Sequence, residues 1–510
     1  MITVLDATVG VLAIYISYRL FKQNLRALPR PPGPKGYPIV GNSLQIPSNH
    51  PWERYMEWAK QYNSDIIRLI APGSEIIIVS SMDKAVDLFE KRSAIFSDRP
   101  YLPMICGLIE LSRWNLALMP YGDLWRDTRK GFHRYLGSQE MTSVRPKVLE
   151  YNHKLLRKLL SEPAEFLAHA RAAPGALILN VAYGFKIADS DDPWLHLVDS
   201  ANEGLIAAAI PGAFLVDLLP FLRWVPAWFP GAGFQRTARE LRKLNADVYT
   251  LPYEDVKRQI LHKGSAPESV TQAMLSGLDV TNITEYEEHC VPGIMFSAGA
   301  DTTVASLKTF LLAMIMYPDV QQRAQDEIDV VLHGERLPNF DDMSTMPYTT
   351  ALMKEVLRWH SPTPLGVARK NTEDDVYDGC FIAKGSIVIP NVWAISRDPK
   401  FYPGDPDSFR PSRFLDASGQ LDPSVLDPTE FFFGFGRRIC PGRYLAQDSM
   451  WIMMSSILAV FKISRRKEDI GVNLERYTTG IIISPEPFEC IIEPRSPQAE
   501  QLILAQVEAL

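Results

Sequence analysis

The sequence predicts a mainly α-helical protein with small β-sheets and an N-terminal membrane anchor helix. Long segments carry apolar residues at three- and four-residue spacing, which is typical of helices with one buried face, and only short segments have β-type composition. The first twenty residues are mostly apolar and basic residues follow them. The chain of 510 residues, 46% of them hydrophobic and 22% charged, is long enough to build a large hydrophobic core.

Residues 1–28 are expected to form an uncleaved, single-pass membrane anchor. Lys22, Arg26 and Arg30 follow the apolar run, whereas a cleaved signal peptide, the alternative, has its basic residues before the run. Asp6 and a length near the lower limit of the roughly 17–25 residues that a spanning helix needs leave a complete span open. Positive charge after the run keeps the following domain in the cytosol, so we expect a protein of the endoplasmic reticulum membrane.

The rest of the chain is predicted to fold as one domain. Residues 29–40 are too rich in proline and glycine to continue a helix and are expected to form a stiff elbow. One large domain over 41–495 and a C-terminal tail over 496–510 follow. Apolar spacing predicts helices over 140–160, 194–209, 237–262, 285–317 and 319–331. Composition predicts strands over 65–70 and 75–79, around a tight turn, and further β-type segments over 375–389 and 477–492.

Charge and cysteine usage exclude several classes of protein. The formal net charge of −7 argues against a nucleic-acid partner, since a polyanion is normally bound by a basic domain or stripe. Cys106, Cys290, Cys380, Cys440 and Cys490 are scattered and include no C-x-x-C pair. Neither a disulfide framework nor a thiolate zinc site is therefore indicated, and a reducing compartment fits this pattern.

Residues 291–317 form the most apolar internal segment, so a second membrane span is the alternative to a buried helix. Asp301 and Lys308 lie inside it with several hydroxyl side chains, which favours a long helix buried in protein. Pro318 is expected to end this helix.

A glycine- and arginine-rich string, FFFGFGRRICPGR over 431–443, surrounds Cys440. A lone cysteine is most often a small buried apolar residue, but here its neighbours indicate a binding site. The three glycines let the backbone turn tightly and approach a flat ligand, and Arg437 and Arg438 offer cations to an acidic cofactor. Backbone N–H groups of such a loop can also hydrogen-bond a sulfur anion.

Phe433, Gly436, Arg438, Cys440 and Gly442 match F-x-x-G-x-R-x-C-x-G, and the chain thereby resembles the cytochrome P-450 superfamily. The resemblance implies the cytochrome P-450 fold and haem b as the cofactor. It also implies that Cys440 is the axial thiolate of the haem iron and that Arg438 contacts a haem propionate. A thiolate ligand donates electron density to the iron and favours cleavage of the O–O bond.

The string AGADTT over 298–303 places an acid and hydroxyls in an apolar helix, where polar groups are costly without a partner. Alone it would equally fit a helix with one satisfied polar turn. It resembles the oxygen-activation motif of the family, which implies that Ala298 and Gly299 lie beside the haem and that Gly299 leaves room for dioxygen. By the same resemblance Thr302 hydrogen-bonds the oxygen and Asp301 relays protons.

Glu355 and Arg358 are three residues apart on one predicted helix face. Such pairs are usually exposed and contribute about 0–1 kcal/mol. With Arg413 downstream they resemble the buried Glu–Arg–Arg cluster of the family, which has a structural role before the cysteine loop. Ser412 departs from the pattern, since the family often has Glu there.

Trp125 and Arg129 are four residues apart and share one face if the segment is helical. In the family this pair binds a haem propionate, and another cation follows the Glu-x-x-Arg helix. Arg369 occupies that second place, within 365–370, where fungal relatives often carry Pro-His-Arg. Arginine can bind a carboxylate through two parallel hydrogen bonds, so the departure retains the chemistry.

The resemblance implies a haem-thiolate monooxygenase that hydroxylates or otherwise oxidises an apolar small molecule. About seventy residues follow Cys440, too few for a flavin domain, so electrons from NADPH are expected to come through a separate NADPH-cytochrome P-450 reductase, with cytochrome b5 as a second donor. Segments 202–205 and 226–233 are similar to the fungal branch devoted to secondary metabolism. We therefore expect a terpenoid substrate, with an aromatic or indolic metabolite as the alternative.

Two other classes stay open. A haem-thiolate isomerase or dehydratase would keep Cys440 but would not need the proton relay that the AGADTT string implies. A haem-binding gas sensor or carrier would need no substrate pocket, whereas four apolar stretches are pocket walls by family position: 102–118, 207–216, 363–367 and 479–483.

Arg126, Lys130 and Arg134 are spaced by four and would share one helix face. A cationic stripe is less expected in a chain of net negative charge, so we predict that the reductase docks there. A merely solvated helix face is the alternative.

Overall fold

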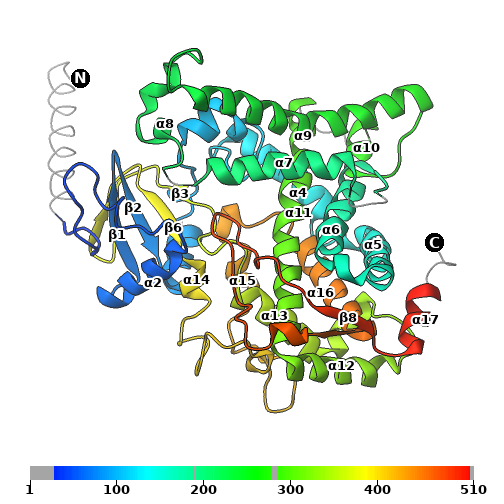
Figure 1. Ribbon diagram of the computed structural model, residues 1–510. Helices are drawn as coiled ribbons and strands as arrows, with labels where there is room; N and C mark the ends of the chain where they lie inside the picture. The colour runs from blue at the N-terminus through cyan, green and yellow to red at the C-terminus, as the bar shows by residue number, and fades with distance from the viewer. Residues whose placement is uncertain (1–27, 188–190, 211, 278–284, 506–510) are drawn as a thin grey trace, which may run out of the picture. The chain divides into compact units, whose positions relative to one another are not determined.

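The computed structural model describes residues 28–187, 191–210, 212–277 and 285–505 (Figure 1). The predicted anchor helix lies outside these residues. The described chain divides into two compact units inside the single domain that the sequence predicted. The first holds the residues up to Pro100 together with Ala368–Asn391, and the second holds Tyr101–Val367 and Val392 onward.

The first unit is built around a four-stranded sheet of order β1-β2-β6-β3. Its strands and helices are α2 (Pro51–Gln61), β1 (Ile66–Ala71), β2 (Ser74–Val79), α3 (Met82–Val86), η1 (Asp87–Lys91), β3 (Arg369–Lys370), β4 (Asp375–Tyr377), β5 (Cys380–Ile382) and β6 (Ile387–Pro390). Gly73, with a φ of 77°, makes the turn between β1 and β2. β2 then pairs in parallel with β6, which comes from the distant segment, Ile76 lying opposite Ile387.

The proline-rich elbow folds against this unit. The backbone N–H of Arg68 donates to Pro32 O at 2.8 Å, and that of Phe381 donates to Pro29 O at 2.8 Å. Arg30 forms an ion pair with Glu75 at 3.1 Å. These contacts place the elbow along β1, β2 and β5, so it belongs to the folded unit.

The second unit is mainly helical. Its α-helices are α4 (Asp123–Leu136), α5 (Met141–Ser161), α6 (Phe166–Tyr183), α7 (Pro193–Ala208), α8 (Leu215–Leu218), α9 (Gly233–Lys263), α10 (Val270–Leu275), α11 (Glu285–Met316), α12 (Pro318–Leu332), α13 (Pro347–Trp359), α14 (Val392–Ile395), α15 (Thr429–Phe432), α16 (Arg443–Val460) and α17 (Pro497–Ala505). Short 3-10 and π turns are η2 (Pro103–Leu108), η3 (Leu111–Arg113), η4 (Pro163–Glu165), η5 (Pro220–Trp224), η6 (Phe340–Thr345), η7 (Pro411–Phe414), η8 (Gly436–Arg438) and η9 (Lys467–Asp469). A two-stranded sheet joins β7 (Phe461–Ser464) and β8 (Ile491–Pro494).

The five helices predicted from apolar spacing are present as α5, α7, α9, α11 and α12, with ends within four residues of the predicted ones. α11 contacts α4, α6, α9, α13 and α16, and Figure 1 shows it crossing the middle of the helical unit. Pro318 occupies the first turn of α12, where its missing N–H costs no hydrogen bond. Among the described residues no single helix is long and apolar enough to cross a membrane, although α11 from His289 and α12 reach that length together across a bend of 105°.

Three further elements differ from the predictions. The segment 477–492 was predicted as β-type, but only its last two residues lie in a strand and a single bridge joins Tyr477 and Pro485. Pro485 and Pro487 lack the N–H groups that a sheet requires. The predicted tail 496–510 contains α17, which contacts α5 and α16. α6 was not predicted, because it is mostly apolar and its few polar residues follow no periodic pattern.

Candidate active site

The loop between α15 and α16 presents Cys440 immediately before α16. Gly434 and Gly436 have φ angles of 78° and 50°, a left-handed backbone that favours glycine and turns the chain sharply. The backbone N–H of Cys440 then donates to Phe433 O at 2.7 Å, and Gly442 directly precedes the first residue of α16. The motif residues therefore form one tight turn with the thiol at its end.

The Cys440 side chain is buried, and nearby donors offset part of the cost of its anionic form. Burial raises the pKa of the Cys440 thiol, while a hydrogen bond from the Gly442 backbone and the charges of Arg129 and Arg443 lower it. Arg129 also donates to Ile439 O, and Arg443 Nη1 donates to Cys440 O at 3.2 Å. Because a coordinated metal deprotonates a thiol outright, these donors suit a thiolate ligand.

Trp125 of α4 has a buried donor that lacks an acceptor among the described residues. The residue is 5% exposed, and its indole N–H makes no hydrogen bond there. Arg438 lies over the indole ring at 4.5 Å and donates to the carbonyls of Leu116 and Met119 at 3.2 and 2.8 Å. A buried donor without an acceptor costs about 1–3 kcal/mol, so a carboxylate of a bound cofactor would complete this site.

Open space lies next to the cysteine loop. A Cβ atom built on Gly442 would meet no atom within 4 Å. This space, the unsatisfied Trp125 donor and the cationic surroundings of the thiol together fit haem bound through Cys440. Arg129, predicted as a second propionate contact, lies beside the loop and bonds its backbone.

Arg369 lies in the first unit, on β3. Its guanidinium group packs over the Phe89 ring at 4.6 Å and donates to the carbonyls of Phe89 and Phe96 at 3.3 and 3.5 Å. Its role toward a haem carboxylate stays a prediction.

The AGADTT string lies in α11. Thr302 Oγ1 donates to Ala298 O at 3.2 Å, and its side chain is half-buried. A Cβ on Gly299 would lie 3.0 Å from Ile178 Cγ1, so glycine at this position lets α6 approach α11 closely. That packing reason was not visible in the sequence, and room for dioxygen at Gly299 stays a prediction.

The Asp301 carboxylate is held by α6 and α7. Its Oδ2 accepts a hydrogen bond from Asn202 Nδ2 at 2.8 Å, and its Oδ1 lies 3.9 Å from Arg171 Nη2. Burial raises the pKa of Asp301, and Arg171 and Asn202 oppose this effect. Since only the protonated acid can donate, a raised pKa is in the direction that a proton-passing group needs.

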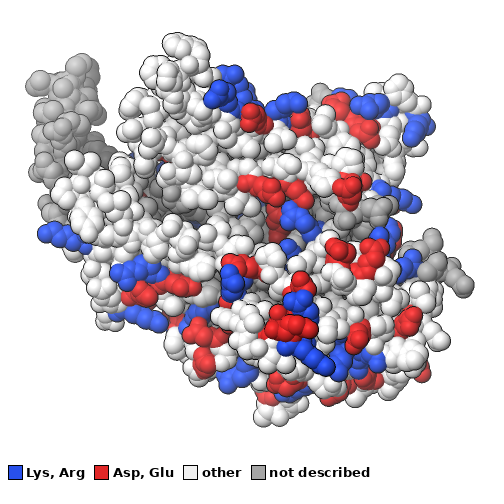
Figure 2. All heavy atoms as spheres, in the orientation of Figure 1, with Lys and Arg blue, Asp and Glu red and all other residues white. Residues whose placement is uncertain are grey.

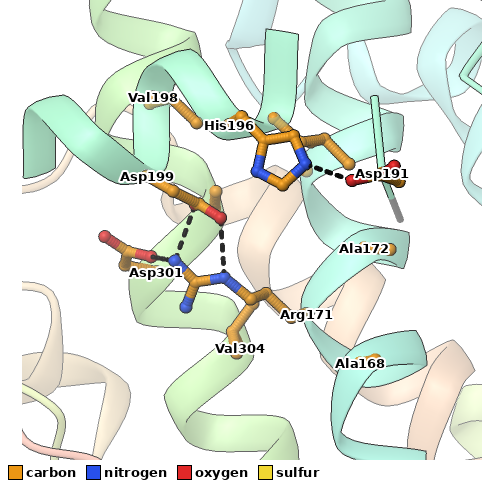
Figure 3. A pocket seen from close by; sticks show the side chains of 12 residues that line it. Ala168, Arg171, Ala172, Asp191, His196, Val198, Asp199, Asp301 and Val304 are labelled. Atoms are coloured by element: carbon orange, nitrogen blue, oxygen red, sulfur yellow. Dashed lines mark hydrogen bonds and ion pairs between the residues drawn. The ribbon is translucent and has the colours of Figure 1, made fainter. Parts of the chain in front are cut away.

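A cleft of about 290 Å³ reaches Asp301 from the surface. Figure 3 shows Asp301, Arg171 and Asp199 on its wall, with His196 and Asp191 paired nearby at 2.6 Å. Asp301 was predicted as a site residue, whereas Arg171, Asp199 and Asn202 were not. The spacing of three between residues 199 and 202 puts both on one face of α7, but nothing in the sequence says which helix that face meets.

The predicted Glu–Arg–Arg cluster comes together in the second unit. Glu355 and Arg358 are fully buried and bonded at 2.7 and 2.8 Å, and Arg413 Nε donates to Glu355 Oε1 at 3.0 Å. Arg358 also donates to the carbonyls of Ser396 and Pro406 at 2.9 and 2.6 Å. The cluster therefore ties α13 to the chain that leads to the cysteine loop.

Two of the stretches predicted as pocket walls contact residues that directly flank another of the stretches. The backbone N–H of Ile483 donates to Pro362 O at 2.8 Å, next to the stretch 363–367. A Cβ on Gly480 would lie 3.6 Å from Ile206 of α7. The N–H of Met104 donates to the Asp217 carboxylate at 2.8 Å, which joins η2 to α8.

The predicted docking stripe lies on α4, and Arg126, Lys130 and Arg134 are all exposed. Arg126 is paired with Asp123, and Lys130 is paired with Asp127 at 2.8 Å. The stripe is therefore less cationic than the spacing alone indicated.

A model of the cytochrome P450 family matches residues 31–492. The chain belongs to the cytochrome P450 family. It is 40% identical over 506 residues to cytochrome P450 monooxygenase COX1 of Coprinopsis cinerea, with 97% of each chain covered. A cytochrome P450 monooxygenase of Armillaria gallica is 40% identical over 503 residues, again with 97% of each chain covered. Tryptamine 4-monooxygenase of Psilocybe cyanescens is 37% identical over 479 residues, which covers 92% of this chain and 93% of the relative.

Family membership and these relatives show that the protein is an oxidoreductase, a P450 monooxygenase. Membership also implies haem as the cofactor and a redox partner that supplies electrons. The P450 motif loop and the polar turn of α11 both lie in the helical second unit.

Proposed function

We propose that this P450 oxidises an apolar fungal secondary metabolite of the terpenoid class, by inserting one oxygen atom from dioxygen. NADPH supplies the electrons through a separate NADPH-cytochrome P450 reductase, with cytochrome b5 as a second donor. The observation that carries the proposal is the cysteine loop, in which the Cys440 thiol, the unsatisfied Trp125 donor and open space beside Gly442 occur together.

Haem b with a thiolate ligand supplies the oxygen chemistry when bound. The chain's own residues hold it and control protons around it. Cys440 would ligate the haem iron, and Trp125, Arg129 and Arg438 would hold the haem carboxylates. Thr302 offers its hydroxyl on one face of α11, and Asp301, which lines the cleft, takes up a proton there and passes it on.

The substrate is expected to be apolar and uncharged. The four pocket stretches contain one acid, Glu110, which pairs with Arg113 at 3.1 Å and with Arg242 at 2.7 Å. An ammonium substrate would need an acid of its own, because a buried unpaired charge is costly. The sequences of the four stretches contain no further acid that could pair with an ammonium group, and this favours a terpenoid. The second candidate is an indolic metabolite, which the relative named tryptamine 4-monooxygenase favours.

Turnover with isotopically labelled dioxygen tests the proposal. Full-length enzyme, reductase and NADPH are incubated with terpenoid and indolic panels, after substrates have been selected by their shift of the Soret band. We expect a terpenoid product that contains one labelled oxygen atom and requires NADPH. A product that forms without NADPH and contains no labelled oxygen would indicate an isomerase or dehydratase. Turnover of indoles but not of terpenoids would show that the substrate is an indolic metabolite.

We further propose that the enzyme sits on the endoplasmic reticulum membrane with its catalytic units in the cytosol. Apart from the predicted anchor, the segment after α7 exposes large apolar side chains, including Trp224 at 75% and Trp228 at 80%. Figure 2 shows an almost uncharged surface over α8, with basic side chains beginning over α9. No acid occurs between Asp217 and Glu240, while Arg223 and Arg236 are exposed. Aromatic residues flanked by arginine suit the interface of a bilayer with anionic lipids.

A further inference from the structure

Asn202 joins α7 to the polar turn of α11 in a way that the sequence did not predict. Its amide nitrogen donates to Asp301 Oδ2 at 2.8 Å and to Ser297 O at 3.0 Å. Residues 297 and 301 are one helical turn apart, so a single amide fixes the carboxylate against that turn. Asn202 is 9% exposed, so water competes little for these bonds.

Arg171 of α6 is shared between two carboxylates. Its Nη2 lies 2.7 Å from Asp199 Oδ1 but 3.9 Å from Asp301 Oδ1, and its Nε donates to Asp199 Oδ2 at 2.9 Å. Figure 3 shows the guanidinium between the two acids. Because Coulomb attraction falls with distance, Asp199 takes most of the interaction and leaves Asp301 with a weaker ion pair.

The other charged groups around this pair are few. Lys308 of α11 acts on Asp301, and Glu203 of α7 acts on Arg171. His196 and Asp191 pair with each other where they line the same cleft. None of these groups contacts either oxygen of Asp301 among the described residues, so Asn202, Arg171 and Asp199 dominate its surroundings.

We propose that Asn202 and Asp199 are positioning residues for proton delivery. Asn202 holds Oδ2 of the Asp301 carboxylate on the cleft side of α11. Asp199 holds Arg171 and prevents it from forming a closer ion pair with Oδ1 of Asp301. That oxygen takes a proton from water in the cleft. The inference rests on the proposed role of Asp301. It adds to that role the two residues that set how readily Asp301 is protonated.

The two residues act on the pKa of Asp301 in opposite directions. Asn202→Leu removes a donor that stabilises the charged carboxylate, so the pKa of Asp301 should rise. Asp199→Asn removes a nearby anion and frees Arg171 to approach Asp301, so the pKa should fall. Each shift is expected to be about one pH unit, the size that follows from one hydrogen bond to a charged group.

The test uses the full-length, haem-loaded enzyme. Infrared difference spectroscopy follows the carboxylic acid band of Asp301, which is assigned by its loss in Asp301→Asn, and product formed per NADPH is measured over the same pH range. The pH midpoint of the Asp301 band and that of product per NADPH should both move to higher pH in Asn202→Leu and to lower pH in Asp199→Asn. Asn202→Gln should restore both wild-type midpoints. The matched control is Asn245→Leu, since Asn245 is 4% exposed and its amide donates to Leu241 O of its own helix at 2.8 Å.

The outcomes separate this inference from the proposed function. If Asp301→Asn leaves product per NADPH unchanged, Asp301 is no relay and the proposal falls with it. Asp301→Asn can instead lower product per NADPH while the Asn202 and Asp199 variants keep the wild-type midpoints or both shift them in the same direction. In that case the relay stands and the positioning inference is wrong. Asp199 is half-buried, so its variant gives a result even if Asn202→Leu fails to fold.

Discussion

Single hydroxyl groups on α11 have different surroundings, and this difference gives a prediction for Thr302. Thr302 is half-buried in the polar turn, whereas the adjacent Thr303 is buried in the helix packing. Thr302→Ala removes the hydroxyl that we expect to guide protons, so product per NADPH should fall several-fold and peroxide should rise, with haem content unchanged. Product and peroxide are measured per NADPH consumed. Thr303→Ala is the control, and an equal loss in both variants would contradict the assignment.

Two ion pairs of similar geometry differ in burial. Glu355 and Arg358 are buried at 2.7 Å, while Arg54 and Glu57 of α2 are exposed at the same distance and the same spacing. Glu355→Ala leaves Arg358 and Arg413 buried without a carboxylate and should destabilise the protein by about 3–5 kcal/mol. Glu57→Ala should change stability by about 0–1 kcal/mol. Denaturant unfolding and haem content are compared, and equal unfolding midpoints would show that the cluster does not hold the fold.

The sequence predicted residues of the site where a local string carried the chemistry, and missed them where the contact joined distant segments. Cys440 and its loop lie within thirteen consecutive residues, so their pattern was readable. The bond from Asn202 to Asp301 spans 99 positions, and its partners follow from which helix faces pack together. The unsatisfied N–H of Trp125 likewise depends on burial by other segments.

At the level of elements, α9 and α12 could be predicted from their polar faces, whereas α6 could not. α9 and α12 keep apolar residues on one face and polar residues on the other. α6 is mostly apolar, because it packs on α5 and α11, so it lacked a period to detect. In 477–492 the apolar run indicated strands, but proline interrupts it and the chain forms a loop.

α4 carries the predicted contact with the reductase. Reversing Arg126, Lys130 and Arg134 to Glu should lower the rate of reduction by about tenfold or more at low salt, because the charges steer an acidic partner. The difference should shrink as salt rises, since the screening length is roughly 8 Å at physiological ionic strength. The rate is measured by stopped flow. Reversal of Arg236, Arg239 and Lys243 on α9 is the control, and an unchanged salt-dependent rate in the α4 variant would refute the docking face.

The molecule as a whole is divided in a way that sequence order hides. The first unit pairs β2 with β6, although the two strands are far apart in the sequence. The residues between Pro100 and Ala368 belong to the second unit. Such a long-range pairing has no local signal, so the division into two compact units could not be predicted from the sequence. Motif order along the chain nevertheless predicted the family that matches 31–492.

The elbow sets where the chain can be cut. A protein that starts at Pro29 keeps the carbonyls of Pro29 and Pro32, which accept bonds from Phe381 and Arg68, so it should fold and bind haem. Microsome binding should weaken but persist, and should weaken further when Trp224 and Trp228 are replaced by Ser. Fractionation with microsomes measures this. Failure of the truncated, soluble protein to take up haem would show that residues 1–28 belong to the fold.

The central claim is that Cys440 holds the haem iron as a thiolate. Its most direct test is the absorption spectrum of the reduced, carbon-monoxide-bound, full-length protein, with Cys106→Ser as a control for loss of a buried cysteine elsewhere. We expect a red-shifted Soret band in the wild type and in Cys106→Ser, and its loss in Cys440→His. A histidine-type band from correctly folded wild-type protein, or a red-shifted band that survives in Cys440→His, would contradict it.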